Sequence, residues 1–261
     1  MTAKVYFIGA GPGDPELITV KGQRLLEQAN TIVYTDSLIP PTLLRGLKPD
    51  VNLVPSADKS LPEIIEILVH AARSGQCVVR LQDGDPSLYG AIQEQMKALA
   101  AENIEFELIP GVSAYQLAAA RLQVELTQPQ QVQTVILTRM GGRIAMPPGE
   151  ELASLAAHRA SLCLYLSAKN VAAAEAELLQ HYPAKTPVAI CFRLGWPDEQ
   201  IVLVNLAKMA ETTTAENLQR TTLYVISPAL EYSTLWDSHQ AETFRSRLYD
   251  GNYDRLFKPV E

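Results

Sequence analysis

Three loops rich in glycine, proline and acidic residues contain the side chains of this sequence that are best suited to chemistry. The most acidic loop is Arg80–Gly90, RLQDGDPSLYG, which begins within an apolar run. Gly84 has no Cβ, so the backbone there can approach a ligand closely. Asp83 and Asp85 add negative charge, which disfavours phosphate and favours a ligand that offers a cation or hydroxyl groups. The order Asp85 then Pro86 predicts a helix cap followed by the first helical residue.

A second loop, Gly9–Asp14, GAGPGD, follows the first apolar run of the chain. It departs from the dinucleotide-binding pattern GxGxxG, because Asp14 stands at the sixth position, where that pattern needs glycine. Pro12 also lacks the backbone N–H that would donate to a phosphate. The third loop, Pro110–Ala114, PGVSA, again follows an apolar run. Each loop alone fits an ordinary turn, but their recurrence at strand ends favours a ligand site.

The sequence contains no GxSxG, HExxH, CxxC or Walker A pattern, so it predicts neither an activated nucleophile nor a metal site. Cys77, Cys163 and Cys191 each lie in an apolar run and are expected to be buried free thiols. No catalytic residue is assigned, although Asp36 and Tyr89 are candidates for moving a proton. Acidic, glycine-rich loops suit S-adenosylmethionine, which has a sulfonium, an amino group and ribose hydroxyls, better than they suit ATP.

Apolar strands and amphipathic helices must position these loops. Strand-like runs at Lys4–Gly9, Cys77–Leu81 and Glu105–Ile109 each lead directly into one of the three loops. Leu61–Ser74 is the clearest helix, with apolar residues at positions i, i+3, i+4 and i+7 and Gly75 directly after it. Alternating strands and helices predict an α/β fold with a mostly parallel sheet. Right-handed crossovers then place the three loops on one edge of that sheet.

The polar stretch Glu125–Gln133, ELTQPQQVQ, is the expected domain boundary. We therefore predict an N-terminal α/β domain over residues 1–124, a C-terminal α/β domain over residues 125–230 and an extension over residues 231–261. In the second domain, the strand-like runs on either side of Arg193–Glu199 predict a hairpin. This half of the chain is therefore expected to be more antiparallel.

The composition limits the possible partners. Hydrophobic residues make up 47% and charged residues 20% of the 261-residue chain, which is typical of a water-soluble globular protein. The net charge of −7 argues against a general nucleic-acid surface. No apolar run reaches the roughly 18 residues of a membrane span, and glycine and aspartate interrupt the first apolar run where a signal peptide would continue. We expect a cytoplasmic protein that binds neither nucleic acid nor membrane.

The chain resembles the tetrapyrrole methylases of cobalamin biosynthesis. Their two signatures, GxGPGDP and an internal GDP, match Gly9–Pro15 and Gly84–Pro86, and the resemblance extends over residues 4–230. Asp83 departs from the most similar branch of the family, which usually has threonine or serine before the glycine of GDP. That branch methylates C11 of precorrin-4, and four further stretches resemble it: residues 13–26, 84–95, 125–139 and 192–202.

The resemblance implies the fold and the chemistry of the family. That fold has two α/β domains with the active site in the cleft between them, and the family forms homodimers. The implied reaction transfers a methyl group from S-adenosyl-L-methionine to C11 of precorrin-4 or cobalt-precorrin-4. Carried over motif by motif, the cofactor-binding residues would be Pro12, Asp83, Gly84, Asp85, Leu88, Ser113, Ala114, Leu166 and Leu194.

The implied substrate is a tetrapyrrole with many carboxylates, so an acidic protein needs a local group of basic residues to bind it. Arg139 and Arg143 are the first candidates, and Lys21, Arg80 and Arg193 also lie in or beside the family motifs. Three alternatives stay open. They are a related methylase acting at another ring carbon or on another substrate, a nucleotide-binding oxidoreductase, and a cofactor-binding sensor without catalysis.

Overall fold

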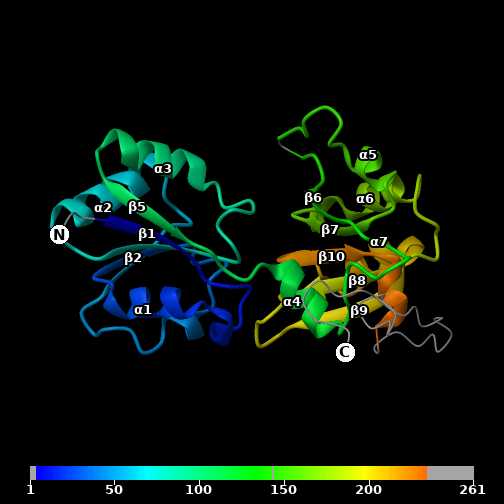
Figure 1. Ribbon diagram of the computed structural model, residues 1–261, viewed down its shortest axis with the longest axis horizontal. Helices are drawn as coiled ribbons and strands as arrows, with labels where there is room; N and C mark the ends of the chain where they lie inside the picture. Colours follow the sequence, from blue (N-terminus) through cyan, green and yellow to red (C-terminus); the bar gives the residue numbers. More distant parts are fainter. Residues whose placement is uncertain (1–3, 143, 234–261) are drawn as a thin grey trace, which may run out of the picture. The chain divides into compact units, whose positions relative to one another are not determined.

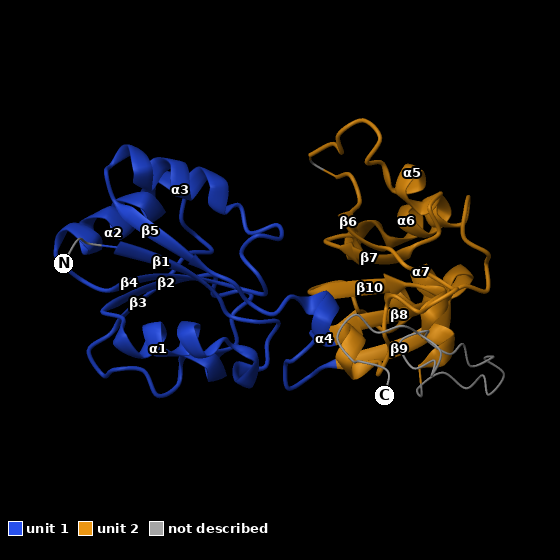
Figure 2. Ribbon diagram, viewed as in Figure 1, with its two compact units in different colours: residues 1–117, 193–199 blue, residues 118–192, 200–261 orange. Residues whose placement is uncertain are grey.

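The computed structural model describes residues 4–142 and 144–233, and the chain divides into two compact units (Figure 1; Figure 2). Unit 1 comprises residues 1–117 and 193–199, and unit 2 comprises residues 118–192 and 200–261. The predicted extension over residues 231–261 lies almost entirely outside the described residues.

The division between the units lies inside helix α4, Ala114–Arg121, whereas the sequence predicts a boundary after residue 124. Residues 193–199 join unit 1, although the strands on either side of them, β8 (Pro187–Phe192) and β9 (Gln200–Asn205), belong to unit 2. The polar stretch at residues 125–133 therefore does not coincide with the division between the two units.

Unit 1 contains a five-stranded parallel sheet. Its strands in spatial order are β3 (Asn52–Pro55), β2 (Thr31–Tyr34), β4 (Val78–Gln82), β1 (Lys4–Gly9) and β5 (Glu105–Ile109). β1 and β4 are interior strands covered on both faces, which explains their nearly continuous apolar sequences. Because β1 lies between β4 and β5, the three strands predicted to lead into loops are neighbours.

Helices cover both faces of this sheet (Figure 1). They are α1 (Val20–Gln28), α2 (Leu61–Arg73) and α3 (Ile92–Ala101). α2 and α3 pack on the face that carries Phe7 of β1, and α1 packs on the face that carries Ile8. A capping box of Ser60 and Glu63 begins α2, and Gly75 follows its last turn with a φ of 75°, as the sequence predicts.

Unit 2 contains a five-stranded mixed sheet. Its strands in spatial order are β6 (Val135–Arg139), β7 (Ser161–Tyr165), β10 (Thr222–Ile226), β8 and β9. β6 and β7 are parallel, while β7 with β10, β10 with β8, and β8 with β9 pair antiparallel. The predicted hairpin is confirmed, because β8 and β9 are adjacent antiparallel strands joined by residues 193–199.

The helices of unit 2 pack on a core that contains Leu164 and Tyr224 of the sheet. They are α5 (Leu152–Ala156), α6 (Val171–Leu178) and α7 (Met209–Ala215). Short 3-10 helices occur in connections at Pro15–Leu17, Pro41–Leu44, Ala168–Asn170, Leu206–Lys208 and Pro228–Tyr232. Cys163 and Cys191 are buried free thiols, as predicted, whereas Cys77 is partly exposed. Throughout the described residues, no helix has both the length and the apolar character of a membrane span.

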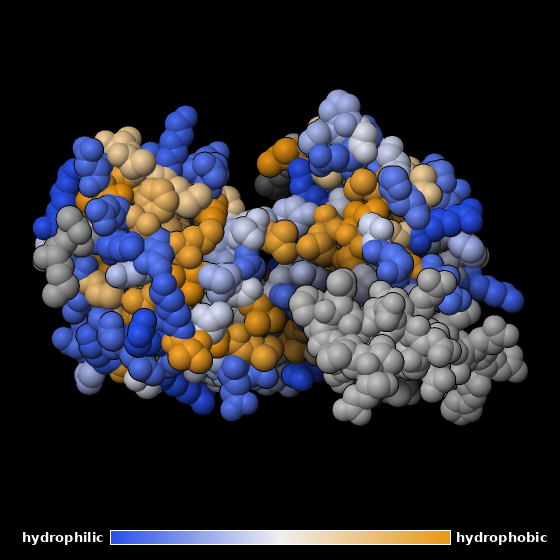
Figure 3. Space-filling model, viewed as in Figure 1, coloured by the Kyte–Doolittle hydropathy of each residue, from blue (hydrophilic) through white to orange (hydrophobic). Residues whose placement is uncertain are grey.

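β5 lies at one edge of the unit 1 sheet. Its Phe106 and Leu108 side chains are 36% and 39% exposed, and Figure 3 shows apolar residues gathered over this part of unit 1. Phe106 packs edge-on against Phe7, with 6.3 Å between the ring centroids. These apolar side chains lie on the edge strand itself and not in the loops that follow the strands.

Candidate active site

The three loops predicted to hold the functional residues lie together at the carboxyl edge of the unit 1 sheet. They follow β1, β4 and β5, which are adjacent and parallel. The prediction that the loops share one edge is confirmed. We call them the opening loop (residues 10–14), the acidic loop (residues 83–91) and the third loop (residues 110–113).

Three glycines bring these loops into backbone contact. A Cβ on Gly9 would lie 2.6 Å from the Cα of Gly111 and 2.7 Å from the carbonyl oxygen of Gly84. A Cβ on Gly111 would lie 2.1 Å from the same Gly84 oxygen. These distances are too short for any side chain, so the loops can meet only if glycine occupies positions 9 and 111. We call this arrangement the glycine contact.

Backbone hydrogen bonds join the opening loop to the acidic loop. The Gly84 N–H donates to the Gly11 carbonyl at 2.8 Å, and the Gly11 N–H donates to the Gly84 carbonyl at 3.3 Å. A phosphate site needs backbone N–H groups that point at the ligand. Because these N–H groups bond within the protein and Pro12 has none, the loops are poorly suited to a phosphate. This geometry counts against a dinucleotide cofactor.

Both carboxylate oxygens of Asp85 are used within the protein. Oδ1 accepts from the Ser87 N–H at 2.8 Å and from the Ser87 hydroxyl. Oδ2 accepts from the Gly111 N–H at 2.9 Å. The predicted helix cap at Asp85 is wrong, because residues 86–89 form a turn and α3 begins only at Ile92. The Asp85 side chain instead closes this turn and joins the acidic loop to the third loop.

Asp83 differs from Asp85 in its surroundings. Its side chain is exposed, and no hydrogen bond or ion pair joins its carboxylate to another residue of the described chain. Desolvation raises the pKa of Asp83, while its own backbone N–H and the charge of Arg80 lower it. Of the two aspartates in the acidic loop, Asp83 is the one whose carboxylate is open to a ligand.

Arg80 lies beneath the acidic loop and is only 5% exposed. Its Nε donates to Oε1 of Gln95 at 3.0 Å, and its Nη1 donates to the Val33 carbonyl at 3.3 Å. Burial lowers the pKa of Arg80 to about 10, which leaves it charged at neutral pH. Gln95 in turn donates to the carbonyl of Ala91, the residue before α3. Arg80 therefore supports the acidic loop from the core and is not a surface cation for a substrate.

Two other basic residues near the motifs are also engaged. Lys21 and Lys4 both form ion pairs with Glu107, the second at 2.7 Å. Their positive charges lower the pKa of Glu107 to about 2, chiefly through the hydrogen bonds they donate. Arg193 pairs with Asp198 at 2.7 Å. Neither Lys21 nor Arg193 is left as an uncommitted cation.

The other predicted cofactor residues lie on or beside the same loops. Pro12, in the opening loop, and Leu88, in the turn of the acidic loop, are both partly exposed. Ser113 is buried at the end of the third loop, where its N–H donates to Oε1 of Gln116 at 2.8 Å. Ala114 is the first residue of α4.

Leu194 reaches this group through the loop between β8 and β9. Its side chain is buried, and its carbonyl oxygen would lie 2.7 Å from a Cβ on Gly13 of the opening loop. The predicted cofactor residues other than Leu166 therefore all belong to unit 1. Their role in binding a cofactor stays a prediction.

Arg139 and Leu166 lie at one edge of the unit 2 sheet. Arg139 ends β6 and pairs in register with Tyr165 of β7, and Leu166 follows Tyr165. The Met140 N–H donates to Oγ of Ser167 at 2.9 Å, which joins the two strand ends. Leu166 is 72% exposed and has a φ of 53°, a strained value for a leucine. An exposed apolar side chain on a strained backbone is typical of a ligand contact.

The Arg139 guanidinium is partly committed to its own loop. Its Nη1 donates to the carbonyls of Met140 at 3.3 Å and Ile144 at 3.2 Å. Within the described chain it forms no ion pair, so its charge is not neutralised by a carboxylate at contact distance. Arg143, the second predicted substrate residue, lies outside the described residues.

The two candidates for moving a proton have different surroundings. Oδ1 of Asp36 accepts from the Ala57 N–H at 2.9 Å, which holds the chain after β3 against the end of β2. Tyr89 is 43% exposed and has a φ of 57° at the end of the acidic-loop turn. One Asp36 oxygen therefore has a structural role, and neither residue is assigned as a catalytic group.

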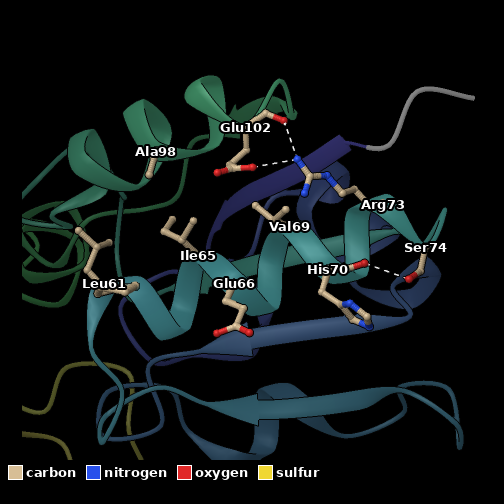
Figure 4. A pocket seen from close by; sticks show the side chains of 10 residues that line it. Leu61, Ile65, Glu66, Val69, His70, Arg73, Ser74, Ala98 and Glu102 are labelled. Carbon is tan, nitrogen blue, oxygen red and sulfur yellow. Dashed lines mark hydrogen bonds and ion pairs between the residues drawn. The ribbon is translucent and has the colours of Figure 1, made fainter.

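A separate groove lies between α2 and α3 and has a volume of about 710 Å³ (Figure 4). Leu61, Ile65 and Val69 form its apolar wall, and the ion pair of Arg73 with Glu102, at 2.8 Å, spans one end. Its described lining residues come from the two helices and their ends, and not from the three loops. This groove is therefore distinct from the candidate active site.

The sequence profile of the Tetrapyrrole (Corrin/Porphyrin) Methylases matches residues 4–210. The chain belongs to this family. The methylase is 44% identical over 257 residues to the precorrin-4 C(11)-methyltransferase of Pseudomonas aeruginosa, and the match covers 98% of this chain and 99% of that relative. The resemblance seen in the sequence is confirmed.

Solved structures agree with this family and fold. The X-ray structure of the cobalt precorrin-4 methyltransferase CbiF is 38% identical and superposes with a TM-score of 0.85, covering 88% of this chain and 96% of that one. The uroporphyrin-III C-methyltransferase of Thermus thermophilus, solved in complex with S-adenosylhomocysteine, is 27% identical with a TM-score of 0.72, covering 87% and 93%. The predicted two-domain α/β fold is confirmed.

Sequence reasoning missed two features of the site. It assigned Asp85 to a helix cap, whereas the residue joins two loops that are distant in sequence. It also did not predict that residues 193–199 pack on the opening loop. The sequence features that could have indicated the contact between residues 193–199 and the opening loop were Gly13 and Gly195, because a glycine in each of two loops permits close backbone approach.

Proposed function

We propose that this methylase transfers a methyl group from S-adenosyl-L-methionine to C11 of precorrin-4 or cobalt-precorrin-4 in cobalamin biosynthesis. The observation that carries the proposal is the 44% identity to a precorrin-4 C(11)-methyltransferase over 98% of this chain and 99% of the relative. The chain is also similar to a cobalt precorrin-4 methyltransferase, with 38% identity and a TM-score of 0.85, so the proposal includes both precorrin-4 and cobalt-precorrin-4 as substrates.

The loops of unit 1 fit S-adenosylmethionine as methyl donor. This compound carries a sulfonium and an amino group but no phosphate. The loops match it because the N–H groups of Gly11, Gly84 and Gly111 are bonded internally, while the Asp83 carboxylate is open to a cationic group. The residues that would hold the donor are the predicted set: Pro12, Asp83, Gly84, Asp85, Leu88, Ser113, Ala114, Leu166 and Leu194.

Within this set the structure distinguishes two roles. Asp83 would bind the donor directly, since its carboxylate is exposed. Asp85 would act through the backbone, since its oxygens already accept from Ser87 and Gly111. The glycine contact fixes the three loops as one surface, so the donor meets a preformed site.

The donor, when bound, supplies an electrophilic methyl group. The tetrapyrrole carbon that receives it is electron-rich, so the protein needs no strong nucleophile of its own. Alignment of the two reactants is the main contribution expected from the chain, and it is worth at most about 7–11 kcal/mol in well-oriented systems. The preformed loops of unit 1 are suited to this task.

We propose Arg139 and Arg143 as contacts for the carboxylates of the tetrapyrrole. Arg139 lies at a strand end beside Leu166 and has no carboxylate partner in the described chain, so its positive charge can attract an anionic substrate. The same proposal includes a homodimer, which the family resemblance implies, and a cytoplasmic location, which we expect from the sequence. Light scattering coupled to size-exclusion chromatography tests the dimer, and a monomer at micromolar concentration contradicts it.

Turnover with methyl-labelled S-adenosylmethionine tests the reaction. The purified protein is incubated with precorrin-4 and, separately, with cobalt-precorrin-4, and the labelled product is examined by NMR. We expect label at C11, and the faster substrate identifies the natural one. Label at another carbon agrees with membership of the family but refutes the assignment to C11. Absence of transfer to either substrate, with both shown to be intact, refutes the proposed function.

A further inference from the structure

The loop Arg193–Glu199 contains a tryptophan that packs against the opening loop. A Cβ on Gly13 would lie 2.6 Å from Cδ1 and 2.9 Å from Nε1 of Trp196. The same Cβ would lie 2.7 Å from the Leu194 carbonyl oxygen. Gly13 also has a φ of 147°, which side chains rarely adopt. The indole therefore occupies the space beside Gly13 that only glycine leaves open.

The fit between the two loops is reciprocal. A Cβ on Gly195, where φ is 77°, would lie 2.5 Å from the backbone nitrogen of Asp14. It would also lie 3.1 Å from the carbonyl carbon of Gly13. Each loop thus contributes a glycine at the contact, and the two backbones meet without an intervening side chain. A small displacement of either backbone must displace the other, because closely packed groups have no free volume between them.

Trp196 is itself held in place by residues of its own loop. The Arg193 guanidinium carbon lies 4.0 Å from the centre of the indole ring, within the range of a cation–π contact. Arg193 is oriented by its ion pair with Asp198 at 2.7 Å. The Gly195 N–H donates to Oε2 of Glu199 at 2.6 Å, which closes the loop at its base. The indole is therefore fixed on one side by Arg193 and contacts Gly13 with its Cδ1–Nε1 edge.

We propose that Trp196 is a positioning residue of the methyl-donor site. It fixes the opening loop against Leu194, so that Pro12 and Leu194, two predicted donor contacts, keep a constant separation. This inference rests on the proposed function, because it assumes that the two residues bind the donor. Trp196 takes no part in the chemical step and acts only through the backbones it contacts.

Trp196 also provides an optical signal for the test. The chain contains two tryptophans, so a Trp236→Phe variant leaves Trp196 as the single indole. Titration of this variant with S-adenosylhomocysteine is expected to change the emission of Trp196. The midpoint should match the dissociation constant that calorimetry gives for the wild type. An unchanged emission during saturation, as judged by calorimetry, contradicts contact between the donor site and Trp196.

The decisive comparison uses Trp196→Ala and Trp196→Phe. We expect Trp196→Ala to weaken S-adenosylhomocysteine binding about tenfold, because Pro12 and Leu194 then lose their fixed separation and binding the donor must order the two loops. It should raise KM for S-adenosylmethionine more than it lowers kcat, and leave KM for the tetrapyrrole nearly unchanged. Trp196→Phe keeps an aromatic ring against Gly13 and should restore most of the affinity. A loss of stability alone would not produce this pattern.

Phe106→Ala is the matched control. It also removes a partly exposed aromatic ring from unit 1, but from the edge strand β5 and away from the loops. It should lower Tm without changing the affinity for S-adenosylhomocysteine. If Trp196→Ala does not fold, Trp196→Leu takes its place, since it retains apolar volume without the indole.

The outcomes separate this inference from the function on which it rests. A wild-type protein that does not bind S-adenosylhomocysteine refutes the proposed donor and the inference together. A wild-type protein that binds it, with Trp196→Ala binding equally well, refutes the inference alone. Weakened binding by Trp196→Ala, rescue by Trp196→Phe and unchanged binding by Phe106→Ala support it.

Discussion

Replacing Asp85 by asparagine separates a loop-holding role from direct contact with the donor. The native carboxylate accepts hydrogen bonds from Ser87 through Oδ1 and from the Gly111 N–H through Oδ2, at 2.9 Å. Asparagine has one acceptor oxygen and one NH₂ group, so it can accept hydrogen bonds from Ser87 or from Gly111 but not from both. If the amide oxygen of asparagine faces Ser87, its NH₂ group faces the Gly111 N–H, so that two hydrogen-bond donors point at each other.

The size of the effect follows from the surroundings of these bonds. A hydrogen bond to a charged group contributes about 1.5–3 kcal/mol. The Ser87 bonds are exposed and the Gly111 bond is partly buried, so we expect a loss near the lower end of this range, about 1–2 kcal/mol. The corresponding fall in Tm is about 2–8 °C. If the donor binds only the closed loops, its affinity falls by a factor of at most about 5–30, because other contacts also hold the loops closed.

Asp83→Asn is the matched control, because it removes the same charge two positions away. Asp83 is exposed and makes no hydrogen bond to another described residue, so this variant should change Tm by less than about 1 °C. It should nevertheless weaken S-adenosylhomocysteine binding if its carboxylate faces the donor. Thermal unfolding and calorimetry on both variants give the two quantities needed.

A loop-holding role for Asp85 is refuted if Asp85→Asn changes neither Tm nor affinity, because its two sets of hydrogen bonds would then contribute nothing. Equal destabilisation by both variants also contradicts it, since the effect would then come from net charge and not from the Gly111 bond. Only a fall in Tm specific to Asp85→Asn agrees with a residue that holds two loops together.

Three further predictions follow from the same structure. Arg139→Ala should weaken tetrapyrrole binding and leave S-adenosylhomocysteine binding intact, and equal loss of both ligands in calorimetry contradicts it. Gly111→Ala should lower the free energy of unfolding by about 3 kcal/mol, since its Cβ would lie 2.1 Å from the Gly84 oxygen. Gly75→Ala has open space around its Cβ and should lose only about 1–2 kcal/mol, because of its left-handed backbone conformation. Urea unfolding measures both values. Lys4 and Lys21 lower the pKa of Glu107 from 4.5 to about 2 in the folded protein, so its contribution to stability is complete above pH 4.5 and is lost as the pH falls toward 2. The urea midpoint of Glu107→Gln should therefore lose this part of the pH dependence, and an unchanged pH profile contradicts the ion pairs.

The sequence predicted the position of the candidate site because that position depends on strand order and direction. Apolar runs at Lys4–Gly9 and Glu105–Ile109 are readable as buried strands, and both are strands in the structure. Parallel strands end on one edge, so three loops recognised separately had to share it. The shared edge follows from strand order and direction alone and does not depend on any side-chain contact.

The sequence did not predict how the residues of the site are used, because that depends on contacts between distant segments. Asp85 bonds to Gly111, and Trp196 packs on Gly13, across separations that no local pattern records. Arg80 stands beside the GDP motif and resembles a substrate cation in sequence. Its position within β4 places it in the core, where Gln95 accepts its hydrogen bond. Burial on both faces of an interior strand decides the role of this residue.

The glycine contact limits how this methylase could be altered by directed evolution. Gly9, Gly84 and Gly111 come from three segments of the chain, yet a side chain at position 9 or 111 would force all three loops apart. Libraries that randomise one of these loops at a time will therefore yield mostly inactive protein at positions 9 and 111. Changes of specificity are more accessible beyond them, in residues such as Leu88 and Tyr89, whose side chains reach the surface. Transfer of the site to another scaffold would require the three loops to be moved as one set.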